Sequence, residues 1–290
     1  MTVRFLRPTS DLVFKKIFGE NPDIVRSFLN NILPLEKNGL IESIEYLPSE
    51  QIPRIPVLKN TIVDVKCKDK KGRIFIVEMQ MAWSASFMKR FLFNASKAYA
   101  GQLDVGEYYQ NLCPVYGLAI LNDTFGLDKS DRWYYRYRVA DVDNPQNVIE
   151  GLELVLVELP QFKPRDWSEK KLGALWLRFL REMKEGLDEV PQEFLEDTCM
   201  AKAVKLTQEA SYTKAQLESY DAFLDAVRVQ NTYMRDSLNE GRAIGKEEGL
   251  KEGMEKAKME MAKQMLFLQI NIETIHQCTG LSLAEIMDLT

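Results

Sequence analysis

Two acids and one glutamine within residues 62–80 have the types and the spacing of a metal-binding site. Thirteen residues separate Asp64 from Glu78, and Gln80 follows two positions later. On both sides of the charged turn 69–73, every second residue is apolar and the positions between hold the acids, lysines, Gln80 and three isoleucines, which predicts two strands joined in a hairpin. Carboxylates that lie close together repel each other. A divalent cation such as Mg²⁺, which prefers carboxylate oxygens and water, relieves that repulsion.

The alternation also predicts how the two strands pair. If Lys68 lies opposite Ile74, then Asp64 lies opposite Glu78. One face of the hairpin is then entirely apolar and carries Val63, Val65, Cys67, Phe75, Val77 and Met79. A shift of one residue would bury the acids and expose these side chains, so the pattern favours this register. A surface hairpin with solvated acids is the alternative, because Asp followed by Glu-x-Gln is a loose pattern.

Composition narrows the chemistry to carboxylates and a metal ion. The chain has a single histidine, His276, and four scattered cysteines. Ser-His-Asp and Cys-His catalysis, His-rich zinc sites and HNH-type sites are therefore not expected unless a partner chain supplies residues. The scattered thiols predict a reducing, cytoplasmic location. No membrane contact is expected, because no run has the length of a membrane span and the N-terminus lacks the apolar core of a signal peptide.

The net charge gives little guidance about partners. Its total is −5, but residues 1–150 hold 20 Lys and Arg against 18 Asp and Glu, whereas residues 151–290 hold 18 against 25. A nucleic-acid channel needs only a local basic stripe. A negative net charge therefore does not exclude DNA as a binding partner.

The elements around the hairpin must position these residues. Two short helices are expected before it, the first with Ser10 as its N-cap and Gly19 at its end, the second opening at Pro22. Asp11 lies in the first turn, where an acid also interacts favourably with the helix dipole. Beyond the hairpin itself, strands are predicted over residues 41–47, 115–122, 133–139 and 153–159, and a helix over residues 85–103. This mixture favours an α/β sheet with helices packed on it.

Basic side chains on two of these elements are candidates for contacts with phosphate. Arg90 and Lys97 lie two turns apart on one side of the helix over residues 85–103. A solvated helix face accounts for the same spacing. Lys66 projects from the same strand face as Asp64, two residues along, and is a third candidate.

Only helices are predicted after residue 167. They cover residues 172–183 and 193–210, and residues 214–267 form one long helix or two. Glycines at positions 241, 245, 249 and 253 indicate either a close approach of two helices or a charged linker. Residues 270–290 read as helix, turn and helix. Because no basic residue follows Lys263, this tail favours packing or dimerisation over DNA recognition.

Together these motifs resemble the Rpn family of recombination-promoting nucleases and transposase-like proteins, within the PD-(D/E)XK nuclease superfamily. The likeness rests on D-x-x-F-K-x-x-F-G from Asp11, on the acids and Gln80 of the hairpin, and on the passage from Tyr99 to Tyr116. It covers roughly residues 5–162. Most members of the superfamily have lysine where this chain has Gln80.

The resemblance implies a metal-dependent DNA endonuclease linked to recombination. Asp64, Glu78 and Asp11 would hold Mg²⁺, for which Mn²⁺ can substitute. Gln80 would occupy the place of the catalytic lysine, so a recruited base such as Lys66 or Lys97 would have to supply the missing charge.

The resemblance also implies a fold and a domain order. A restriction-endonuclease-like α/β core, with a mixed β-sheet flanked by helices, would occupy residues 1–165. An all-helical C-terminal region would follow, with residues 166–237 packing on or extending the core and residues 238–290 forming a charged tail. Two alternatives stay open: a degenerate nuclease fold that binds DNA or protein without cutting, and an assembly module that forms homo-oligomers through its C-terminal helices.

Overall fold

The computed structural model describes residues 4–51, 61–81, 84–123, 132–163 and 171–289. The chain divides into two compact units, Met1–Leu224 and Asp225–Thr290. The domain boundaries predicted at residues 165 and 237 stay predictions. No helix within the described residues is both long enough and apolar enough to span a membrane.

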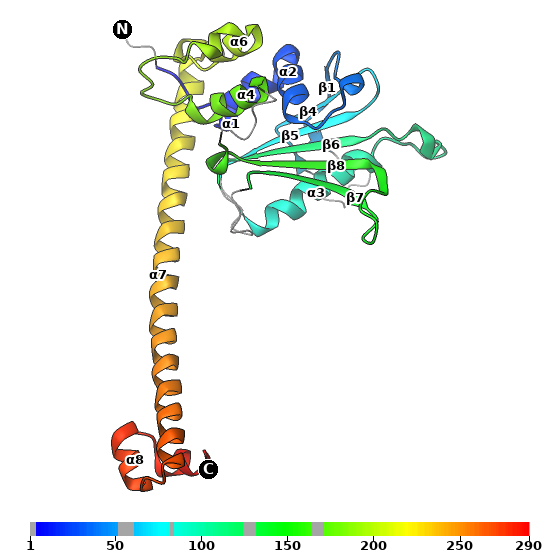
Figure 1. Cartoon of the computed structure of the whole chain (residues 1–290). Helices are drawn as coiled ribbons and strands as arrows, with labels where there is room; N and C mark the ends of the chain where they lie inside the picture. Colours follow the sequence, from blue (N-terminus) through cyan, green and yellow to red (C-terminus); the bar gives the residue numbers. More distant parts are fainter. Residues whose placement is uncertain (1–3, 52–60, 82–83, 124–131, 164–170, 290) are drawn as a thin grey trace. The chain divides into compact units, whose positions relative to one another are not determined.

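A mixed six-stranded sheet forms the centre of the first unit (Figure 1). Its strands are β1 (Glu45–Tyr46), β4 (Val65–Lys68), β5 (Ile74–Gln80), β6 (Val115–Leu121), β7 (Tyr134–Ala140) and β8 (Val148–Glu158), in the spatial order β1-β4-β5-β6-β8-β7. The central strands β5, β6 and β8 run parallel, and the remaining pairs are antiparallel. The ends of β5, β6 and β8 therefore lie along one edge of the sheet.

Helices cover both faces of this sheet, which confirms the predicted fold class (Figure 1). On one face α3 (Ala85–Ala100) packs Phe87 and Phe91 over Ile76. Gly117 of β6 permits this approach, because a Cβ there would lie 2.7 Å from the Phe91 ring. On the other face lie α1 (Asp11–Phe14), η1 (Lys15–Gly19), α2 (Pro22–Ile32), α4 (Lys171–Glu182), α5 (Glu193–Glu196) and α6 (Thr198–Leu206). Short 3₁₀ turns complete the unit at Lys37–Gly39, Tyr109–Asn111, Leu159–Gln161 and Glu209–Ser211.

The hairpin of β4 and β5 has the predicted register. Lys68 pairs with Ile74, and Val65 pairs with Val77. The turn is fixed by Asp69, whose carboxylate accepts hydrogen bonds from the backbone N–H groups of Lys71 and Arg73, both at 3.0 Å. Because side chains alternate between the two faces of a strand, a slip of this pairing by one residue would expose core side chains.

The strand predicted before this turn is interrupted at Asp64. The prediction of one continuous strand from Ile62 to Lys68 was therefore wrong. Residues Thr61–Ile62 form β3, which pairs with β2 (Glu50–Gln51) in a separate two-stranded sheet. The chain then bends at Asp64 and enters the main sheet at Val65. As a result Val63 packs in the core beneath α3, whereas Val65 packs in the core on the opposite face. Val63 is therefore not on the face that carries Met79.

Other boundaries differ from the prediction for local reasons. The strand predicted over residues 41–47 is confined to β1. Ser10 does not cap α1, because its hydroxyl donates to the carbonyl of Arg7 instead. The helix predicted over residues 193–210 is divided, since Asp197 accepts from Met200 N–H and starts α6.

The second unit contains most of α7 (Lys214–Phe267), a single helix that begins in the first unit. Two short helices, α8 (Ile272–Thr279) and α9 (Leu283–Met287), follow it and confirm the predicted helix–turn–helix tail. A small core joins them to the end of α7 through Ala262, Ile275 and Ile286. Outside the glycine's own stretch of helix, no described atom lies within 4 Å of a Cβ built at any of the four regularly spaced glycines.

Candidate active site

Asp64 lies at the bend between β3 and β4 with its side chain 22% exposed. Its Oδ2 atom accepts a hydrogen bond of 2.7 Å from the backbone N–H of Met79 on β5. The carboxylate therefore takes the place of a backbone acceptor where the regular ladder has ended. Its other oxygen, Oδ1, lies 3.8 Å from Nζ of Lys15.

Glu78 is the neighbouring carboxylate, near the end of β5, and it is 6% exposed. Its Oε1 atom accepts a hydrogen bond of 2.8 Å from Nδ2 of Asn94, a buried residue of α3. Among the described residues no donor contacts Oε2. Asp64 and Glu78 thus share an arrangement in which one oxygen is held by the protein and the other is left without a hydrogen bond.

The electrostatics of the two carboxylates favour a cation. Burial raises the pKa of Asp64 above its ordinary value, against the opposing effects of the Met79 N–H group and of Lys15. Burial likewise raises the pKa of Glu78, and the charge of Asp64 raises it further, while the Asn94 hydrogen bond lowers it. Both ionised groups are therefore incompletely compensated by their surroundings.

These residues fit a hard divalent cation by the chemistry of their donors. Carboxylate oxygens are the ligands that Mg²⁺ and Mn²⁺ prefer, and a Mg²⁺ site commonly uses one or two carboxylates with several waters. The described residues contain no group of three or more acidic, histidine or cysteine side chains arranged for a metal ion. The protein would thus supply two carboxylates, from Asp64 and Glu78.

Asp11 is placed beside this pair but not within it. Its side chain is 55% exposed, and Oδ1 lies 2.7 Å from Nζ of Lys15. The structure does not bring Asp11 into a three-carboxylate group with Asp64 and Glu78. It connects to Asp64 through the lysine that lies between them.

Gln80 and the predicted basic residues lie on the α3 side of the sheet. Oε1 of Gln80 accepts a hydrogen bond of 2.7 Å from Arg90. Lys97 donates to the backbone carbonyl of Gln51. Burial lowers the pKa of Lys66, and the nearby charge of Lys97 lowers it further. Arg90 thus contacts a predicted site residue directly.

Two residues of this site were missed by the sequence analysis. Asn94 stands on the same helix side as Arg90 and Lys97, so its position was predictable, but its contact with Glu78 depends on how α3 lies on the sheet. Lys15 follows Asp11 by four residues, and this helical spacing is a signal for an ion pair that the sequence does contain.

Glu78→Gln is expected to stabilise the metal-free protein at neutral pH. Because the folded protein raises the pKa of Glu78 above its ordinary value of 4.5, the folded state binds more protons than the unfolded state in the interval between the two values. Stability therefore falls as the pH rises through that interval. The variant lacks this titration, so its advantage should be full above the folded pKa and should disappear as the pH falls to about 4.5. Urea unfolding in EDTA across this pH range measures it, and an advantage that grows at lower pH would contradict the assignment.

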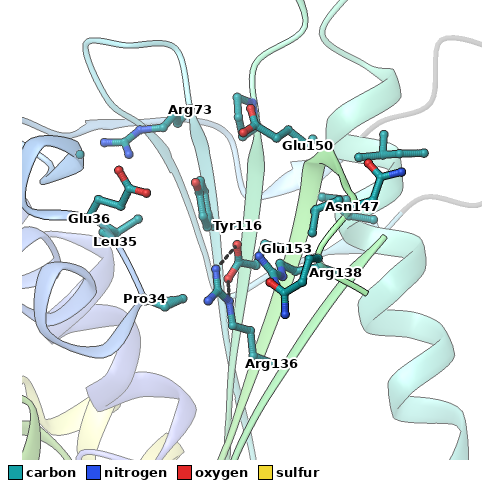
Figure 2. A pocket seen from close by; sticks show the side chains of 17 residues that line it. Pro34, Leu35, Glu36, Arg73, Tyr116, Arg136, Arg138, Asn147, Glu150 and Glu153 are labelled. Atoms are coloured by element: carbon teal, nitrogen blue, oxygen red, sulfur yellow. Dashed lines mark hydrogen bonds and ion pairs between the residues drawn. The ribbon is translucent and has the colours of Figure 1, made fainter. Parts of the chain in front are cut away.

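A cavity of about 740 Å³ lies at the opposite ends of β6 and β8 from Glu78 (Figure 2). Its wall includes Tyr116, Arg136 and Glu153, and Figure 2 shows the guanidinium group of Arg136 paired with the Glu153 carboxylate. The residues of the candidate site do not line it. The cavity is therefore separate from the pair of carboxylates.

A comparison with known protein families matches the part of the chain that contains the candidate site. A family model described as PD-(D/E)XK nuclease family transposase matches residues 8–237. The matched part includes α1, the hairpin, α3 and the helices that complete the core. No curated protein and no solved structure matches the chain.

Proposed function

The chain belongs to the PD-(D/E)XK nuclease family transposases, and we propose that it is a metal-dependent DNA endonuclease that hydrolyses phosphodiester bonds. Membership confirms the resemblance to the Rpn family and supports a nuclease-like function. The observation that carries the proposal is the arrangement of Asp64 and Glu78, each with one oxygen fixed by the protein and one oxygen without a hydrogen bond.

The residues around the carboxylates have distinct tasks in this proposal. The backbone N–H of Met79 orients Asp64, and Asn94 orients Glu78. A divalent ion bound by the two acids supplies positive charge for the phosphate and lowers the pKa of water. Gln80 is neutral, but its amide can donate a hydrogen bond. Arg90, which contacts Gln80, is placed to bind a phosphate oxygen.

The reaction is a hydrolysis whose atoms balance without any further reactant. The oxygen of a water molecule forms a bond to phosphorus, and the bond from phosphorus to one ester oxygen breaks. The departing oxygen takes up a proton, and the attacking water gives up a proton. Lys66 and Lys97 lie on the side of the sheet that carries Glu78 and are proposed to contact the DNA backbone, with Asp11 acting on the site through Lys15.

The wider setting is part of the same proposal. A link to DNA recombination follows from the transposase-like character of the family. A reducing compartment, the cytoplasm, suits a chain whose four cysteines are all free. Large apolar side chains are exposed along α7, among them Leu238, Ile244 and Leu250, and they support a homo-oligomer formed through the C-terminal helices. The mass of the full chain, compared with that of a chain lacking residues 238–290, tests the oligomer.

The function is tested by incubating supercoiled plasmid with the full chain and Mg²⁺, Mn²⁺, Ca²⁺ or EDTA. Nicking is expected with Mg²⁺ and Mn²⁺ and not with EDTA. The second candidate, a degenerate fold that binds without cutting, is favoured by the uncharged Gln80 in the site. Retained DNA binding with no cleavage under any metal would replace the nuclease proposal by that candidate.

Asn94→Ala is expected to lower the nicking rate by about 10–100-fold, the range typical of residues that orient a metal ligand. The reason is that Oε1 of Glu78 loses the donor that fixes its direction. Asn30→Ala is the matched control, because Asn30 also makes side-chain hydrogen bonds, to the backbone of Ile41, but lies on α2. Initial nicking rates measure the effect. Equal losses in both variants would show that the loss arises from folding and not from Glu78.

A further inference from the structure

Hydrolysis of DNA in this site requires positive charge that the end of β5 does not provide. Glu78 and Asp64 are acidic, Gln80 is neutral, and the phosphate brings further negative charge. A transition state that builds charge on phosphoryl oxygens is stabilised by hydrogen-bond donors and cations fixed beside it. Arg90 contacts Gln80 and supplies one such cation. A second one lies on the opposite side of Asp64.

That second cation is Lys15. Its Nζ atom lies 3.8 Å from Oδ1 of Asp64, the oxygen that does not face Met79. It also lies 2.7 Å from Oδ1 of Asp11. The other lysines considered for the site lie on the α3 side of the sheet, where Lys97 donates to the carbonyl of Gln51 and its charge acts on Lys66.

The backbone around Lys15 fixes this direction. Lys15 begins η1, a π-helical turn, and such turns are rare and occur frequently at functional sites. The next residue, Lys16, points to a different part of the fold, where it donates to the carbonyl of Ser211 and lies 4.1 Å from the centre of the Tyr212 ring. The turn is anchored by Phe14 and Phe18, which are fully buried.

The environment of Lys15 leaves it free to act on a substrate. Its side chain is 42% exposed, and its partner Asp11 is 55% exposed. An ion pair as exposed as this contributes little to stability, so the ammonium group can exchange Asp11 for a phosphate oxygen at small cost. The flexible lysine stem allows this movement while the buried turn holds its origin.

We propose that Lys15 is a catalytic residue whose ammonium group donates a hydrogen bond to the phosphate under attack and supplies the charge that Gln80 lacks. The proposal rests on the nuclease function proposed above. The part of Lys15 in the reaction is electrostatic, and no proton passes through it.

The test compares Lys15→Met, Lys15→Arg and Lys68→Met in the full chain. Lys68 is the matched control, because its side chain is 40% exposed and ion-paired with Glu45, at the far end of β4. Kinetics of plasmid nicking in Mg²⁺ give kcat and KM for each variant. A separate measurement, Mn²⁺ binding to the DNA-free protein, reports on the carboxylates independently of cleavage.

Lys15→Met is expected to lower kcat by about 10²–10³-fold, the loss typical of removing one donor to transition-state charge, with KM changed by less than about threefold. Lys15→Arg should recover at least about a tenth of the wild-type kcat, since it keeps the charge. Lys68→Met should stay within about twofold of wild type in both constants. Mn²⁺ affinity should not fall in Lys15→Met, because a cation next to Asp64 has been removed.

Five results would overturn the assignment of Lys15 as a catalytic residue. A Lys15→Met variant with wild-type kcat would remove Lys15 from the reaction while leaving the nuclease function intact. A change confined to KM would reduce it to a binding contact, and a parallel loss of Mn²⁺ affinity would reduce it to a residue that positions Asp64. Equal losses in the Met and Arg variants would show that charge is not the required property. If the wild-type chain itself does not nick DNA, both proposals fail together.

Discussion

Asp64→Asn and Glu78→Gln are each expected to lower the rate of metal-dependent nicking by at least about 10³-fold. A metal ion stabilises the charge of the transition state by several kcal/mol, and each tenfold in rate corresponds to about 1.4 kcal/mol. Each variant removes a negative ligand but keeps the shape of the side chain. The amide oxygen that replaces a carboxylate oxygen can still accept the hydrogen bond from Met79 or Asn94 that holds the wild-type group.

Glu153→Gln is the matched control for these two variants. Glu153 is also a mostly buried acid of the same sheet, with its side chain 14% exposed, but it pairs with Arg136 and lines the separate cavity. Its nicking rate should stay within about threefold of wild type. Rates are measured on the same plasmid preparation in Mg²⁺ and in Mn²⁺. Equal nicking by wild type and both acid variants would place the activity in another site or in a contaminant.

Trp176→Ala is expected to lower the free energy of unfolding by about 3–5 kcal/mol, the range for truncating a fully buried aromatic residue. Trp176 lies on α4 and is fully buried. Its ring centre is 5.9 Å from that of Phe18 and 5.8 Å from that of Phe28. Because Phe18 belongs to the same turn as Lys15, α4 supports the segment that carries Asp11 and Lys15 to the sheet.

Urea unfolding of the full chain measures this loss, with Tyr108→Ala as the control. Tyr108 is 74% exposed in the same unit, and its truncation should change stability by less than about 0.5 kcal/mol. A loss below about 1 kcal/mol in Trp176→Ala would contradict the view that α4 is part of the same core as the sheet. It would favour an independent helical region, as the predicted boundary at residue 165 also allows.

The hairpin was predictable because its pattern is local and strict. Side chains alternate with a period of two, and only one register buries Val65 and Val77 together, so the pairing of Lys68 with Ile74 follows from the sequence. The bend at Asp64 was not predictable in the same way. It arises because Ile62 pairs with Glu50 in a second sheet. The alternation of side chains within residues 62–80 does not indicate this pairing, because Glu50 lies outside that segment.

The helices likewise contain one feature that residue types indicate and one that depends on packing. Asp197 is an N-cap inside the segment read as one helix over residues 193–210, and that start signal was available in the residue types. The π-helical turn at Lys15 was not, because its hydrogen-bond pattern depends on what Phe14 and Phe18 pack against. The sequence therefore predicts where helices exist more reliably than where they change character.

In the candidate site, too, contacts set by the strand register were predictable, and contacts set by tertiary packing were not. The proximity of Asp64 and Glu78 followed from the register and is found in the structure. The roles of Asn94 and Lys15 required the placement of α3 and η1 on opposite sides of the hairpin, which only tertiary packing determines. Asp11 lies beside Lys15, which stands between it and Asp64, and its role as a metal ligand stays a prediction.

The bend at Asp64 has a consequence for how this lineage can diverge. Val63 and Val65 pack in two different cores, and Asp64 lies at the bend between them, where β3 leaves its own sheet and β4 enters the main one. An acid has low strand propensity, and under the nuclease function proposed above selection would maintain Asp64 only while cleavage is useful. A descendant released from that selection is expected to replace Asp64 by a residue of higher strand propensity. The residue type at this bend would then distinguish inactive descendants from active ones.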